Sequence, residues 1–199
     1  MEDNISSFFS GDEIQKRRQI VSLMEDWKYE IARNYDPEYW EKENPISDSY
    51  FISDGFFPGY YNQEIKVLFI GREPRFMYEE GDWVHYMIKH FETDNQNNKI
   101  LARCLLYIVY GIKNKGKLEF EDVKRETADG IAKKIKDLGF AFMDLSKYSN
   151  CNDKPDADYD LIKQFLKDSN LEKTNYFQKE IENIEPRYYY YFKFMEWQN

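Results

Sequence analysis

The sequence predicts a single α/β domain, with three α/β/α layers around a short, mainly parallel sheet. Two short apolar runs, residues 65–70 and 140–143, have the composition of strands buried on both faces. Stretches with helical apolar spacing separate the runs, as expected of parallel crossovers. The length of 199 residues fits one domain with a sizeable core. Within it, residues 1–62 form a helical and irregular lead-in, and residues 63–199 form the core.

The lead-in begins with a helix predicted over residues 11–35. Its apolar positions recur at helical spacing: Ile20, Leu23, Met24, Trp27 and Ile31. Residues 38–63 mix aromatic side chains with turn-forming pairs, so we expect an irregular, packed segment there.

Helices are expected on both sides of the second apolar run. Residues 76–90 indicate a loop with a short helix, and residues 100–111 a buried helix that ends near Gly111. A further helix is predicted over residues 120–138, with Gly139 as its cap.

The last part of the sequence predicts two helices and a strand. After a polar loop over residues 149–157, Leu161 to Leu166 supply a helical apolar face, and Thr174 or Asn175 caps the helix that Pro186 ends. Residues 188–194 are aromatic and typical of a strand. Such a strand at an open sheet edge predicts self-association through that edge, above all if the chain is a truncated product.

Charge and hydropathy exclude several classes of protein. The net charge of −9 opposes generic nucleic-acid binding, although a local basic rim around a pocket is compatible with it. No apolar run reaches the roughly 18 residues of a membrane span, and the N-terminus lacks signal-peptide features. We therefore expect a cytoplasmic protein with no membrane partner.

Cysteine and histidine usage predicts no cofactor. Cys104 and Cys151 are far apart in the sequence and are expected to be free thiols in a reducing compartment. With only these cysteines and with His85 and His90, a four-cysteine zinc or iron–sulfur site is excluded.

The residues that follow the first apolar run indicate a functional site. Gly71 lets the backbone leave the strand sharply, and Pro74 keeps Glu73 extended at the strand mouth. Sites in open α/β sheets lie outside the carboxyl ends of the strands. Glu73 is thus a candidate for chemistry, and the alternative is a solvated carboxylate in a turn.

Three segments together resemble the uracil-DNA glycosylase superfamily. Its Gly-x-x-Pro pattern after the first core strand matches residues 71–74, with Glu73 where one branch has an Asp that positions the attacking water. Its second strand ends in Asn-x-x-Lys, in which the Asn reads the base. Here Asp144 takes the place of that Asn and Lys147 matches the Lys. The superfamily also has a segment in which a helix containing Glu-Ile is followed by a Pro and then by a strand. Residues 177–194 resemble this segment.

The resemblance covers residues 50–194 and implies hydrolysis of an N-glycosidic bond to a base flipped out of DNA. It makes Glu73 and Asp144 the candidate catalytic residues. The candidate substrate-binding residues come from the two strand ends: Gly71, Arg72, Pro74, Arg75, Phe76 and Lys147.

Individual roles follow from residue type. Arg72, Arg75 and Lys147 are expected to hold phosphates, or else to be surface residues. Stacking on the base is expected from one of the nearby aromatic residues, which otherwise serve packing: Phe76, Tyr78 or Trp83. One histidine, His85 or His90, is a candidate donor to the departing base, and simple exposure is the alternative.

Two departures from the superfamily pattern lead to a second hypothesis. The superfamily usually adds a further strand and a loop with a His that stabilises the departing base, and we expect that loop to be missing here. An ionised Asp144 only accepts hydrogen bonds and would repel the carbonyl oxygens of uracil. The alternative is a catalytically inactive nucleotide- or nucleic-acid-binding protein of the same fold.

Overall fold

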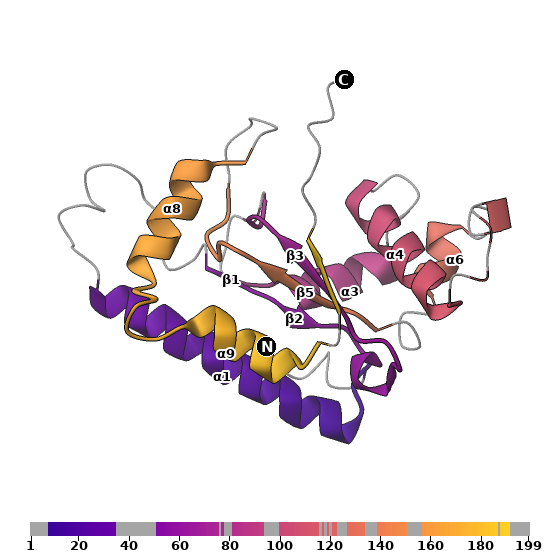
Figure 1. The fold of residues 1–199 in the computed structure, drawn as a ribbon, viewed down its shortest axis with the longest axis horizontal. Coiled ribbons are helices and arrows are strands. Elements are labelled where there is room, and N and C mark those ends of the chain that lie inside the picture. The colour runs from indigo at the N-terminus through magenta and orange to yellow at the C-terminus, as the bar shows by residue number, and fades with distance from the viewer. Residues whose placement is uncertain are drawn as a thin grey trace.

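The fold is mixed α/β, with a small and mainly parallel central sheet (Figure 1). It is seen in a computed structural model that describes these residues: 8–34, 51–75, 77, 81–93, 100–115, 117, 119, 121–122, 127–133, 139–150, 157–186 and 188–191.

Four strands make up the central sheet, in the order β2 (Gly55–Phe56), β5 (Ala141–Asp144), β3 (Val67–Gly71) and β6 (Tyr188–Tyr191). β3 pairs in parallel with both β5 and β6, whereas β2 pairs with β5 in the antiparallel sense. The two predicted apolar strands therefore lie side by side. The parallel sheet character is confirmed.

A second, two-stranded parallel sheet joins β1 (Ile52–Ser53) to β4 (Gly81–Asp82). The segment 38–63 was expected to be irregular and packed. Residues 38–50 lie outside the described residues, and the rest is packed but also holds β1, β2 and the short 3₁₀ helix η3 (Tyr60–Asn62). The two strands were missed because strands of two residues are too short to show the alternation that identifies a strand in a sequence.

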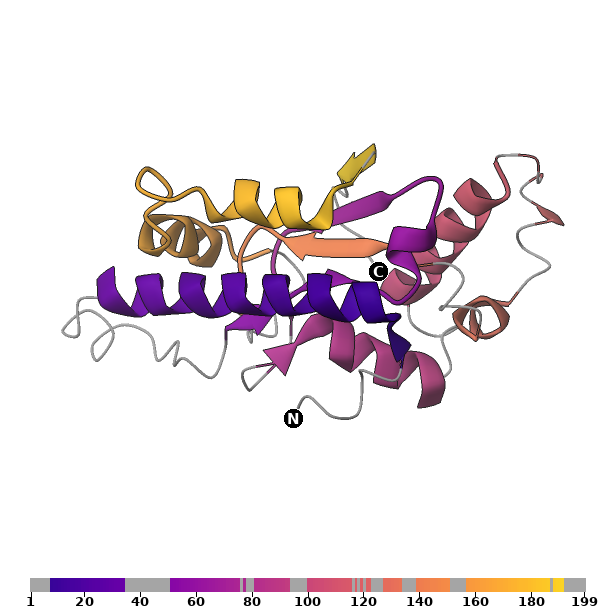
Figure 2. The same cartoon turned by 90° about the horizontal axis from the view of Figure 1, so that it is seen from below.

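The long N-terminal helix α1 (Gly11–Asn34) confirms the predicted helix, and all five of its predicted core positions are buried. In both views it runs beside α9 (Tyr176–Ile184) (Figures 1 and 2). The Trp27 ring stacks on Tyr176 at 5.2 Å, and lies 5.3 Å from the ring of Phe165 in α8 (Tyr159–Asp168). These contacts join α1, α8 and α9 through one aromatic cluster.

Three described helices connect β3 to β5: α3 (Trp83–Thr93), α4 (Ile100–Lys113) and α6 (Ala128–Ala132). α4 continues through Gly111, where the sequence suggested an end, because one helical Gly costs only about 1 kcal/mol relative to Ala. Of the helix predicted over residues 120–138, the structure places α6, whose N-cap Thr127 accepts a hydrogen bond from the backbone N–H of Gly130.

Between β5 and β6 the chain forms α8 and α9, capped by Asp158 and Asn175 respectively. Asn175 is one of the two caps that the sequence offered. Among the described strands, β6 is an edge of the central sheet, so self-association through it remains a prediction. No helix in the described ranges is long and apolar enough to cross a membrane.

Candidate functional site

The two predicted motifs meet where β3 and β5 end. Gly71 and Asp144 are directly paired across the two parallel strands. Beyond this pair, the Leu145 N–H donates to the Gly71 carbonyl at 3.2 Å, and the Ser146 N–H donates to the Arg72 carbonyl at 2.8 Å. The carboxyl ends of both strands are thereby fixed side by side.

Asp144 lies with its carboxyl group against the backbone of β3. A Cβ atom on Gly71 would stand 2.1 Å from Asp144 Oδ1 and 2.9 Å from Phe142 Cζ, so only glycine fits there. Residues two apart in a strand share a face, so Asp144 points to the same side of β5 as Phe142. The Phe142 ring stacks on the buried Trp83 of α3 at 4.1 Å, which gives Trp83 a packing role.

Glu73 is buried at the mouth of β3, with only 9% of its surface exposed. Its Oε1 accepts hydrogen bonds from Asn150 Nδ2 at 3.0 Å and from the Asp158 N–H at 3.2 Å. Its Oε2 has no hydrogen-bond partner among the described residues. Glu73 is therefore an oriented carboxylate and not the solvated turn residue that the sequence left as an alternative.

The loop after β5 is paired with the loop after β3. The Asn150 N–H donates to the Pro74 carbonyl at 2.8 Å, and Arg75 and Asn150 form an isolated parallel bridge. Because Asn150 also binds Glu73 through its side chain, this pairing sets the position of the carboxylate.

Burial raises the pKa of the Asp144 carboxyl group well above its usual range, and the nearby carboxylates of Asp54 and Glu73 raise it further. Lys147 acts in the opposite direction. The environment of Asp144 therefore favours its carboxylic acid form, which has one O–H donor and one carbonyl acceptor.

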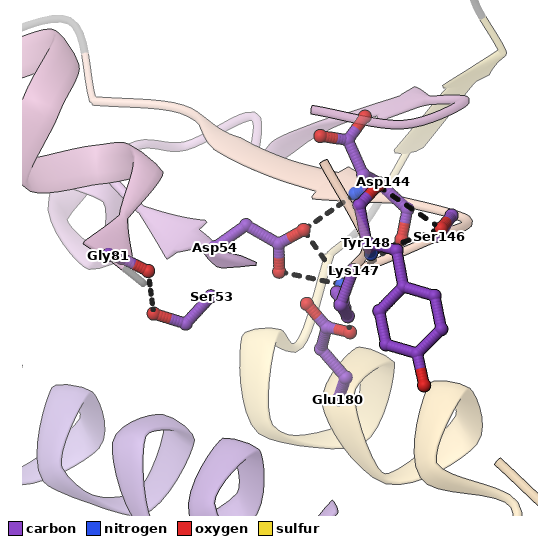
Figure 3. Close-up of polar contacts among 8 residues, drawn as sticks. All are labelled: Ser53, Asp54, Gly81, Asp144, Ser146, Lys147, Tyr148 and Glu180. Carbon is purple, nitrogen blue, oxygen red and sulfur yellow. Dashed lines mark hydrogen bonds and ion pairs between the residues drawn. The ribbon is translucent and has the colours of Figure 1, made fainter. Parts of the chain in front are cut away.

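Lys147 is fully buried and lies in an ion cluster (Figure 3). Its Nζ donates to both carboxylate oxygens of Asp54, at 2.8 and 2.7 Å, and to the Asp144 carbonyl at 3.1 Å, and it lies 3.0 Å from Glu180 Oε2. The prediction that Lys147 holds a phosphate was wrong, because its ammonium group is enclosed and its donors are already used.

Neighbouring charges within the cluster shift the pKa values of Lys147 and Glu180. Burial lowers the pKa of Lys147, but Asp54 and Glu180 together raise it above the usual value, so the lysine stays charged. Burial and the Asp54 charge raise the pKa of Glu180 well above its usual range, against the opposing effect of Lys147. The buried ammonium group of Lys147 thus faces two carboxyl groups, those of Asp54 and Glu180.

The rim of the site carries a cation and an exposed aromatic ring. Arg72 Nη1 donates to the hydroxyl of Tyr159, the first residue of α8, at 3.4 Å, and Tyr159 is 60% exposed. The backbone of Arg75 lies beside this rim. Phe76 and Tyr78 lie outside the described residues.

The two candidate histidines both lie on α3. The His85 N–H donates to Asp82 Oδ1 at 2.9 Å, and the His90 ring lies 4.0 Å from the ring of Tyr86. The described contacts bring neither histidine to Glu73.

Sequence reasoning missed three residues of the site: Asp54, Asn150 and Asp158. Asp158 carried a recognisable signal, an Asp directly before a helical apolar pattern, and its side chain does cap α8. The other two carried none, since turn and loop composition alone accounts for them. Glu180 belongs to the segment that resembles the superfamily, but it was given no role in the site.

No group of three or more potential metal ligands occurs among the residues that the structure places. No protein-family model, curated protein or solved structure matches the chain. The function is therefore argued from the geometry of the two strand ends.

Proposed function

We propose that the protein is a uracil-DNA glycosylase-like hydrolase, which cleaves the N-glycosidic bond to a base flipped out of DNA. One observation carries the proposal. Glu73, at the end of β3, keeps a buried oxygen without a partner among the described residues, while Asp144 ends the adjacent parallel strand. Two carboxyl groups with different environments at one strand mouth suit acid–base chemistry.

The strand order supports a three-layer arrangement with a switch point between β3 and β5. The chain crosses from β3 to β5, and then from β5 back past β3 to β6. Since parallel crossovers are almost always right-handed, the two connections are expected on opposite faces of the sheet. Ligands of open α/β sheets bind at such switch points, and here the loops after β3 and β5 stay hydrogen-bonded to each other as far as Pro74 and Asn150.

Glu73 is the proposed acceptor for the proton of the attacking water. The water oxygen adds to the anomeric carbon of the sugar as the bond from that carbon to the base nitrogen breaks, with its electron pair leaving on the base. Glu73 takes the water proton, which passes to the departing base through solvent, so the products are the free base and a sugar hydroxyl. The carboxylate also stabilises the oxocarbenium-like transition state.

Asp144 is the proposed reader of the base. As a neutral acid it offers one donor and one acceptor, which is the hydrogen-bonding capacity of the Asn that the superfamily has at this position. The repulsion expected from an ionised Asp144 then does not arise. Its O–H group can donate to the base oxygen on which charge develops, as buried neutral carboxylic acids do in other enzymes.

The rim pair of Arg72 and Tyr159 supports a nucleic-acid substrate. A cation suits a phosphate, and an exposed ring suits a stacked base. Arg72 directly precedes Glu73, and Tyr159 directly follows Asp158, whose N–H binds the Glu73 carboxyl group.

Base release from oligonucleotides tests the proposal. Single- and double-stranded substrates carry uracil, hypoxanthine or a mismatch, and the proteins are wild type, Glu73→Gln and Glu182→Gln, an exposed carboxylate of α9 that serves as the matched control. We expect release by wild type and the control, and a loss of about 10²–10⁴-fold in Glu73→Gln.

Two results would contradict the proposal. Equal activity of Glu73→Gln and wild type would remove this carboxylate from the mechanism. No release from any substrate by folded wild type, with weak and salt-sensitive binding, would instead support the catalytically inactive binding protein of the same fold.

A further inference from the structure

Both backbone polar groups of Asp144 are held by the buried ion cluster. Asp54 Oδ2 accepts the Asp144 N–H at 2.6 Å, and Lys147 Nζ donates to the Asp144 carbonyl at 3.1 Å. Figure 3 shows the Asp144 carboxyl group on the other side of its backbone, pointing away from Asp54 and Glu180. The cluster therefore contacts the backbone of Asp144, and the carboxyl group of Asp144 lies at the strand mouth, away from the cluster.

Asp54 is at the centre of this arrangement. It directly precedes β2, is 3% exposed, and binds Lys147 through both carboxylate oxygens. The charged groups that face Asp144 are Asp54 beside β2, Glu73 after β3 and Lys147 after β5, with Glu180 of α9 behind the lysine. Asp54 is the one that touches the Asp144 backbone and also adds negative charge next to its side chain.

We propose that Asp54 is a positioning residue that fixes the backbone of Asp144 and holds its carboxyl group at the strand mouth, so that the site selects bases whose exposed edge pairs one donor with one acceptor. The inference rests on the proposed function for its substrate class. The relation between Asp54 and Asp144 is measurable without turnover.

The substrate class follows from hydrogen-bond capacity. A carboxylic acid pairs with an N–H and an adjacent carbonyl, the edge that uracil and hypoxanthine both present. An ionised carboxylate pairs only with two adjacent donors, as on the edge of guanine. The protonation state of Asp144 therefore decides which bases fit. Burial is the largest cause that raises the pKa of Asp144, and the Asp54 charge raises it further.

The substitution Asp54→Asn removes the negative charge of Asp54 and keeps the size of its side chain. The amide oxygen still accepts the Asp144 N–H, and Lys147 keeps Glu180 as a partner 3.0 Å away. The negative charge beside Asp144 is lost, so Asp144 should ionise at lower pH. One of the two oxygens that bind Lys147 also becomes an amide N–H, so Lys147 depends more on Glu180 in this variant. Asp160→Asn, which alters an exposed carboxylate of α8, is the matched control.

The experiment follows the carboxyl carbon of Asp144 by ¹³C NMR across a pH titration, beside the pH profile of uracil release. In Asp54→Asn we expect the Asp144 midpoint to fall, and the alkaline limb of the release profile to move down in pH by the same amount. Asp160→Asn should leave both curves where they are.

The outcomes distinguish the inference from the proposed function. A midpoint that shifts in a protein that releases no base supports the positioning role and contradicts the hydrolase. Base release with an unmoved Asp144 midpoint overturns the positioning role alone. If Asp54→Asn does not fold, the wild-type titration decides: a midpoint in the ordinary range of aspartate overturns the inference, and a raised one supports it.

Discussion

Replacing Asp144 by Asn should change how the free energy of unfolding depends on pH. Burial and the Asp54 charge raise the pKa of Asp144 in the folded protein. Between the unfolded value of about 4 and the higher folded value, the native protein holds a proton that the unfolded chain has released. The contribution of this proton to stability is fully present below about pH 4 and is lost as the pH rises through that window.

The magnitude follows from linkage. One proton per molecule corresponds to about 1.4 kcal/mol per pH unit. Burial also raises the pKa of Glu180 and of Asp168, but those groups are common to both proteins. The free energy of unfolding of Asp144→Asn, minus that of wild type, should therefore rise by about 1.4 kcal/mol per pH unit up to the folded pKa and then level off.

Urea unfolding monitored by tryptophan fluorescence measures this difference, with the fully buried Trp27 among the probes. Measurements between about pH 5 and pH 8 are sufficient, because the unfolded chain is ionised at this position over that whole range. Asp160→Asn, at an exposed carboxylate, should give a flat difference. A difference between Asp144→Asn and wild type that is equally flat would refute the neutral form of Asp144.

The buried ion cluster and the close contact at the strand mouth give two further predictions. Lys147→Met should lower the free energy of unfolding by about 3–5 kcal/mol, because it leaves buried carboxylates without their cation, whereas Lys163→Met at a surface pair should change it by less than about 1 kcal/mol. Similar losses in both variants, measured by urea unfolding, would contradict the buried cluster. Gly71→Ala should lower the melting temperature, since its Cβ would stand 2.1 Å from Asp144 Oδ1, whereas Gly111→Ala has open space in α4 and should stabilise by about 0.5–1 kcal/mol. A Gly71→Ala protein that melts like wild type would rule out the contact.

The sequence predicted the central strands because both of their faces are covered. All five residues of β3 and all four of β5 are buried, so each strand is written as a continuous apolar run that ends at a polar or glycine residue. Glu73 and Asp144 were assigned to one candidate site through the resemblance of the two strand ends to the superfamily, and the parallel pairing of β3 with β5 brings those strand ends together. β2 was not predicted because it has only two residues, and it is recognised as a strand only by its pairing with β5.

The role of Lys147 could not be predicted from its neighbours in the sequence. Asp54 lies 93 positions away, and Glu180 belongs to a helix that only the fold brings near. A lysine after a strand normally reaches solvent, and nothing local signals that two distant carboxyl groups enclose it. The raised pKa of Asp144 could not be predicted for the same reason, because it depends on burial and on the charge of Asp54.

Mass spectrometry of a uracil-containing DNA strand, incubated with the protein in H₂¹⁸O, tests the hydrolysis most directly. The account predicts free uracil and an abasic strand that carries the heavy oxygen at the former base position, with neither product formed by Glu73→Gln. An intact strand after incubation with folded wild type, or a base lost without uptake of water oxygen, would contradict it.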